Sequence, residues 1–316
     1  AGAGGAGARA ELERTRNDVE AAGAELPALE AEAARARDKE RDAAHGDVRR
    51  GRPAGTWAWG WDEVTTWGEM EAAGMALRDH LEALRAATER CARAGAKVVV
   101  WSELSTVTVG GAQEEVLRGH LRDTARENGI YLLAAIGGVY SQGREGSEGS
   151  GRAVLVNRAL LFDEFGRPAV LDQPKGHPWP GGEYWNTQTE NRSMGVAYTD
   201  AGVMAALVGV DADFPWVARR AGEMGAGLVL VPAAEYAGMD PVHAHMARFR
   251  AVEGGYSVVR SAAGGVTFAA DMLGRVLGTG WQDATAGAGL LVEVPMGGVM
   301  TTYARTGDVL PWACAG

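Results

Sequence analysis

Short apolar runs rich in β-branched residues recur along this chain, and each is too short to be a helix. They cover residues 96–101, 130–136, 203–208, 227–231 and 256–261. Continuous apolar runs of this kind are typical of strands that are buried on both faces. Helical spacing of apolar residues separates them, around residues 69–94, 113–128, 215–224 and 241–254. The alternation predicts sheets covered by helices.

Hairpin signals appear in the later part of the chain. Residues 153–163 and 168–173 flank the turn at 164–167, a second hairpin passes through 271–275, and a last strand is expected at 289–294. A simple doubly wound sheet has few such hairpins. We therefore expect an α/β layered sandwich.

Composition and charge exclude some classes of protein. Of the 316 residues, 46% are hydrophobic and 23% are charged, which is ordinary for a globular protein. The net charge of −10 argues against nucleic acid as a partner, because phosphate binding needs a basic surface. The sequence has no run of eighteen apolar residues and no signal segment at its start. Because the chain begins with alanine, we expect it to be a processed or excised fragment.

Two regions differ in composition. Residues 1–52 form a charged arm rich in Ala, Glu and Arg, expected to be helical or partly disordered and either solvated or packed on a protein partner through residues 1–50. Residues 53–316 form the globular domain, which opens with a short strand of alternating tryptophans at 56–61. Cys91 falls on the apolar stripe of the first helix and is expected to be a core residue, and Cys314 has no obvious role.

Three segments carry candidate catalytic residues. Glu103 ends the apolar run Val100-Trp101-Ser102, at a strand end where α/β folds place their sites. Lys175 and Glu183 lie in the segment KGHPWPGGEY, and Gly209 and Asp211 lie in LVGVDADFP. Alone, an acid after a strand is usually a solvated loop residue. The presence of the other two segments favours a catalytic site that includes Glu103.

These segments resemble those of the nitrilase (carbon–nitrogen hydrolase) superfamily, and the lysine segment is similar to that of apolipoprotein N-acyltransferases. The resemblance implies an α-β-β-α sandwich and a mechanism with a Cys nucleophile, a Glu base and a Lys that stabilises the oxyanion. By resemblance Glu103 is the base, Lys175 the oxyanion lysine, Glu183 a second acid and Asp211 the acid that follows the nucleophile. The nucleophile's own place falls on Gly209.

Later segments extend the resemblance over about residues 95–310. Residues 245–253 resemble a helix carrying Arg-Ala-x-Glu, followed by a strand with Arg260, while 271–275 and 302–308 match a late hairpin and a closing segment. In full-length acyltransferases a membrane helix follows that closing segment. The resemblance therefore implies membrane-associated surroundings on the extracytoplasmic side and a membrane-anchored parent chain.

Departures from the family pattern gather around one place. Gly209 has no side chain to attack a carbonyl, Val210 replaces an aromatic residue, and residues 232–236 and 261–265 lack the usual asparagines. We expect a catalytically silent domain that acts in binding or assembly. The alternatives are a genuine amidase or N-acyltransferase whose cysteine was replaced by Gly209, a subunit of a larger complex, and hydrolysis by a water that Glu103 activates. No cofactor is expected, and no metal, because His177, His243 and His245 are not grouped with acids as ligands.

Overall fold

The computed structural model describes residues 81–142, 152–178, 194–235, 240–281, 289–309 and 313–314. The predicted arm at 1–52, the tryptophan run at 56–61 and Glu183 lie outside the described residues. Helical residues 81–93 confirm the described part of the first predicted helix.

The first sheet joins strands from the first half of the described chain. Its order is β1-β3-β4-β5, and β2 also pairs with β3. The strands are β1 (Val98–Val100), β2 (Thr106–Val109), β3 (Tyr131–Gln142), β4 (Arg152–Phe162) and β5 (Leu171–Pro174). The pairs of β1 and β2 with β3 are parallel, and those of β4 with β3 and β5 are antiparallel.

The second sheet has the order β11-β10-β9-β8-β7-β6. Its strands are β6 (Val196–Thr199), β7 (Gly202–Ala206), β8 (Leu228–Ala234), β9 (Ser257–Ala263), β10 (Val266–Ala270) and β11 (Val276–Trp281). Strands β7, β8 and β9 are parallel, and the hairpins β6–β7, β9–β10 and β10–β11 are antiparallel.

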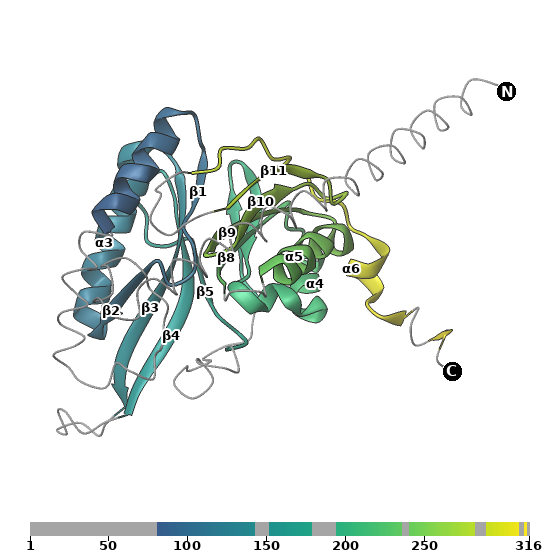
Figure 1. The fold of residues 1–316 in the computed structure, drawn as a ribbon, viewed down its shortest axis with the longest axis horizontal. Helices are drawn as coiled ribbons and strands as arrows, with labels where there is room; N and C mark the ends of the chain where they lie inside the picture. Colours follow the sequence, from purple (N-terminus) through teal and green to yellow (C-terminus); the bar gives the residue numbers. More distant parts are fainter. Residues whose placement is uncertain are drawn as a thin grey trace, which may run out of the picture.

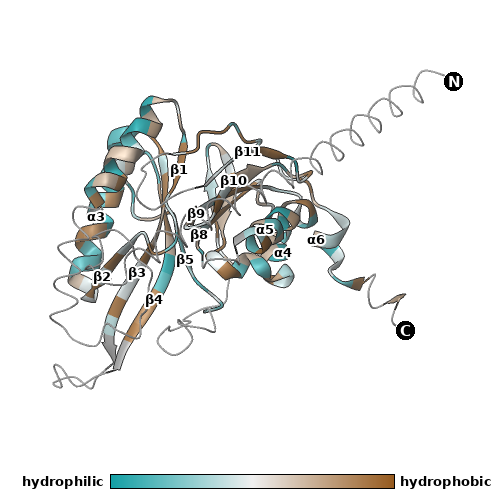
Figure 2. Ribbon diagram, in the orientation of Figure 1, coloured by the Kyte–Doolittle hydropathy of each residue, from teal (hydrophilic) through white to brown (hydrophobic). Residues whose placement is uncertain are grey.

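The two sheets pack against each other, and helices cover their outer faces (Figure 1). Helix α3 (Gly110–Asn128) packs on the first sheet, and α4 (Pro215–Glu223) and α5 (Asp240–Gly254) pack on the second. Figure 2 shows polar residues on α3 and apolar stretches on β1 and β4. The layers confirm the predicted α-β-β-α sandwich.

Alternation along the strands explains their continuous apolar sequences. In β3, Leu132 packs toward α3 while Leu133 packs between the sheets. In β8, Leu230 packs between the sheets while Val229 packs toward the helices. Because consecutive side chains of a strand point to opposite faces, a strand covered on both sides needs an apolar residue at nearly every position.

The prediction of a last strand at 289–294 is wrong. Residues 289–300, called here the C-terminal strap, belong to no helix or strand. The strap runs beside the second sheet, where the Val299 N–H donates to the Gly255 carbonyl oxygen at 2.7 Å. Its sequence resembles that of a strand because some side chains of the strap, such as Val294 and Met296, contact the core between the sheets.

Cys91 is half-buried rather than fully in the core, and its sulfur lies beside Gly289 of the strap.

Within the described ranges, none of the helices combines the length and apolarity that crossing a bilayer requires.

Candidate active site

The ends of several strands bring the predicted residues together. Glu103 follows β1, Lys175 follows β5, and Gly209 lies just after β7. The Glu103 N–H donates to the carbonyl oxygen of Ala233 in β8 at 3.3 Å, which attaches the end of β1 to the other sheet. The site is therefore built from both sheets.

Glu103 is the centre of this site. Its Oε1 accepts hydrogen bonds from Lys175 Nζ at 2.7 Å and from Asn157 Nδ2 at 2.8 Å, and its Oε2 accepts one from the Ala234 N–H at 3.1 Å. Glu103 is 5% exposed and Lys175 is 4% exposed. A buried ion pair persists only when further hydrogen bonds satisfy its members, and Asn157 and Ala234 supply them here.

Gly209 has a backbone conformation and a neighbour that both disfavour a side chain. Its φ is 52°, in the left-handed region. A Cβ built on it would lie 3.0 Å from Cδ of Glu103 and closer still to Oε2. The carboxylate of Glu103 thus occupies the space where a side chain at position 209 would begin.

Asp211 forms hydrogen bonds that link the lysine segment to the segment that begins at Gly209. It lies in the short 3-10 helix η1 (Gly209–Asp213), and its carboxylate accepts from the N–H groups of Gly176 and His177, both at 2.9 Å. His177 Nδ1 lies 2.8 Å from Oδ1 of the same carboxylate. Burial raises the pKa of Asp211 above its ordinary value, although the hydrogen bonds from Gly176 and His177 act against that rise.

A second buried polar cluster adjoins the site and was not predicted. Glu235, directly after β8, forms an ion pair with Arg260 of β9 and lies 2.8 Å from Nδ1 of His243. His243 Nε2 in turn lies 3.5 Å from Asp213. Burial lowers the pKa of Arg260 to about 10, although the charges of Asp213 and Glu103 raise it. The side chain of His243 therefore has polar partners on both of its ring nitrogens.

The structure brings together four of the five predicted residues, Glu103, Lys175, Gly209 and Asp211, while Glu183 lies outside the described residues. Sequence reasoning missed Asn157. Its signal was an amide inside the apolar run of β4, where a buried polar group needs a partner. Among the described residues, no group of three or more His, Cys, Asp and Glu side chains is arranged to hold a metal ion.

The chemistry of this arrangement is that of an acid–base pair. Glu103 and Lys175 form a carboxylate–ammonium pair, and the position beside it carries no side-chain nucleophile. Neither cysteine supplies one, because Cys91 lies beside Gly289 and Cys314 is exposed.

Comparisons with known proteins agree with the fold. The carbon-nitrogen hydrolase family model matches residues 56–298. An amidase structure from Nesterenkonia sp. is 23% identical with a TM-score of 0.59, covering 76% of this chain and 90% of its own. A mutant of the Nesterenkonia AN1 amidase, described as from the nitrilase superfamily, is 25% identical with a TM-score of 0.55, covering 65% and 80%.

Another structure of the AN1 amidase carries the acetamide moiety of fluoroacetamide at its active-site cysteine. It is 23% identical with a TM-score of 0.56, over 65% of this chain and 80% of its own. The curated proteins contain no significant match to the chain. Since the family model spans more than half of the sequence, this chain belongs to the carbon-nitrogen hydrolase family of the nitrilase superfamily.

Proposed function

We propose that this chain is a nitrilase-fold domain of the apolipoprotein N-acyltransferase type that performs no cysteine chemistry and acts in binding or assembly. The observation that carries the proposal is the position of the Glu103 carboxylate, which fills the space beside Gly209. The similarity of the segment from Lys175 to Tyr184 to the acyltransferase lysine segment supports the type.

The chemistry of the family gives the reason for inactivity. Acyl transfer through a thioester requires a thiol close to a base, and a glycine supplies none. Removing the nucleophile from a catalytic unit costs about a million-fold in turnover. The buried pair of Glu103 and Lys175 then remains as a contact between the segments that follow β1 and β5 of the first sheet.

The alternative is a genuine amidase or N-acyltransferase whose cysteine was replaced by Gly209. Two observations favour it: Glu103 and Lys175 keep their contact at 2.7 Å, and similar amidases have an active-site cysteine. Under this alternative, the chain keeps the base Glu103 and the oxyanion lysine Lys175 and lacks the nucleophile.

Restoring the nucleophile separates the two. We expect Gly209→Cys to form no thioester with acyl-ester probes and to hydrolyse no simple amide, with Gly209→Ala as the control for the steric change alone. Intact-mass spectrometry after incubation with the probes detects the adduct. A thioester and steady turnover in Gly209→Cys, both lost when Lys175→Ala is added, would establish the alternative instead.

The proposed assembly role involves the charged arm at residues 1–52. We propose that residues 1–50 contact a protein partner and that the parent protein is membrane-associated on the extracytoplasmic side. Native mass measurement and cross-linking of the full chain test the first part, with cross-links expected within residues 1–50. Cell fractionation tests the second. A strictly monomeric chain without such cross-links would contradict the assembly role.

A further inference from the structure

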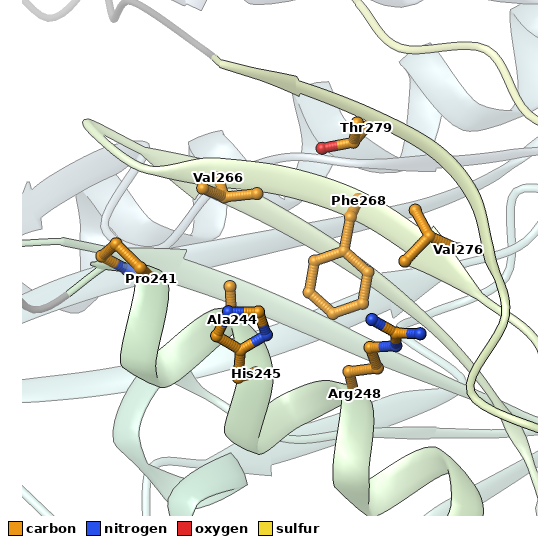
Figure 3. Close-up of a pocket in the computed structure, with 8 residues that line it drawn as sticks. All are labelled: Pro241, Ala244, His245, Arg248, Val266, Phe268, Val276 and Thr279. Atoms are coloured by element: carbon orange, nitrogen blue, oxygen red, sulfur yellow. The ribbon is translucent and has the colours of Figure 1, made fainter. Parts of the chain in front are cut away.

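A hollow lies on the outer side of the second sheet, between α5 and the hairpin of β10 and β11 (Figure 3). Its lining is mostly apolar and includes Ala244, Val266, Phe268 and Val276. The hollow is separate from the site of Glu103, because its walls come from α5 and the far edge of the sheet.

Two nitrogen-bearing side chains of α5, His245 and Arg248, line the same hollow. Both are half-buried. Arg248 Nε donates to the Gly274 carbonyl oxygen at 2.5 Å. Within the described part of the chain, no carboxylate pairs with Arg248 and no hydrogen bond joins His245 to another group.

Two acids of the neighbouring described segments, Asp271 and Glu235, already have cationic partners. Asp271 lies 2.7 Å from Nε of Arg275, and Glu235 pairs with Arg260. The guanidinium of Arg248 therefore has charge that the described residues do not neutralise. A half-buried cation beside an apolar surface favours a ligand that has both an anionic group and an apolar part.

We propose that this hollow binds a small aliphatic monocarboxylate, with its carboxylate on Arg248 and its tail against Phe268. A guanidinium presents parallel N–H donors that match the two oxygens of a carboxylate. A single available guanidinium suits one negative charge better than the two of a phosphate monoester. The inference goes beyond the proposed function, because it involves neither Glu103 nor Lys175.

The wall of the hollow is held in place before any ligand arrives. Arg260 Nη1 donates to the Val266 carbonyl oxygen at 2.5 Å, and β10 pairs with strands on both sides. A preformed wall lowers the entropic cost of binding. The same contact connects the hollow to the buried cluster of Glu235 and His243.

Titration of the full chain with three probes, followed by NMR or calorimetry, tests the proposal. Hexanoate carries both features, hexanamide lacks the charge and acetate lacks the tail. We expect hexanoate to bind at least about tenfold more tightly than either of the others, since each 1.4 kcal/mol changes affinity about tenfold. Arg248→Gln should weaken hexanoate by a similar factor, whereas Arg122→Gln on α3, which removes an equal charge elsewhere, should not.

A bulkier side chain gives an independent check. Val276→Phe narrows the hollow and should abolish hexanoate binding while the thermal unfolding curve stays close to that of the wild type. Equal affinity for hexanoate and hexanamide, or unchanged hexanoate affinity in a folded Arg248→Gln, would overturn the proposal. Absence of saturable hexanoate binding to the wild type would overturn it as well, and this result would leave the experiment on Gly209 unaffected.

Discussion

At position 209 two independent local effects act against a side chain. A φ of 52° costs an L-residue free energy that glycine does not lose, and the nearby carboxylate of Glu103 leaves no room for a Cβ. The carboxylate is itself held by Lys175, Asn157 and the Ala234 N–H. Moving it aside would break contacts that stabilise a buried charge.

We therefore expect Gly209→Ala to lower the free energy of unfolding more than the same change at another left-handed glycine. Gly129 is the matched control, because its φ is 60° and no atom lies within 4 Å of an added Cβ. Gly129→Ala should cost about 1–2 kcal/mol. Urea unfolding measures both, and equal losses would show that Glu103 moves aside without penalty.

Asp211 provides a prediction that depends on pH. In Asp211→Asn one accepting oxygen becomes an NH2 group that faces backbone N–H donors, so the variant should lose about 1–3 kcal/mol at pH 7. The pKa of Asp211 is raised in the folded protein, so the folded state holds its proton to higher pH than the unfolded state, whose ordinary value is 3.8. The stability that wild type gains from protonation of Asp211 therefore increases as pH falls toward 4.

The difference in unfolding free energy between wild type and Asp211→Asn should accordingly grow from pH 7 to pH 4.5. Urea unfolding at several pH values measures it. A difference that shrinks on acidification would mean that the hydrogen bonds from Gly176 and His177 outweigh the burial of the carboxylate.

At the scale of elements, the C-terminal strap depends on glycines in the turns that precede β8 and β9. A Cβ on Gly227 would overlap the carbonyl oxygen of Met296 and lie 3.0 Å from its carbon. A Cβ on Gly255 would overlap the carbonyl oxygen of Val299 in the same way. Backbone atoms cannot rotate out of the way as a side chain can, so these positions determine how closely the strap approaches the sheet.

We expect Gly227→Ala to destabilise the protein by about 1–3 kcal/mol through overpacking. Gly297→Ala, within the strap but with no atom within 4 Å of the added Cβ, is the control and should change stability little. Thermal and urea unfolding compare the two. Similar small effects at both positions would indicate that the strap shifts freely.

At the scale of the molecule, one apolar layer joins the two sheets. Leu133 and Leu161 of the first sheet pack in the same cluster as Met204 and Leu230 of the second. The hydrogen bonds of Glu103 to Ala233 and Ala234 also connect the sheets. The inner faces of both sheets pack in this one layer. We therefore expect the described parts of both sheets to unfold together.

Leu133→Ala tests this expectation. The leucine is fully buried, so the change should cost about 2–5 kcal/mol and shift the tryptophan fluorescence and far-UV circular dichroism transitions equally. Val116→Ala on the exposed face of α3 is the control, with little effect expected. Two separate transitions would show that the sheets unfold independently.

The sequence by itself determined the layered α/β class, the positions of Glu103, Lys175, Gly209 and Asp211, and most of the order of helices and strands. It did not predict the short strands β2 and β6. Those inferences rest on local periodicity and on motifs within short segments, and both are legible along the chain. Its error at residues 289–294 arose because apolar contact makes an unpaired strap and a paired strand look alike in sequence.

Only the tertiary structure decided what fills the space beside Gly209. Glu103, Asn157 and Lys175 come from three separate segments of the first sheet and Ala234 comes from the second, so the hydrogen bond from the Ala234 N–H exists only once both sheets are packed. The ion pair of Glu235 with Arg260 likewise joins separate segments. A buried carboxylate needs a partner for each of its hydrogen bonds, so its partners determine how it is oriented. Because these partners are distant in sequence, no local pattern encodes the orientation.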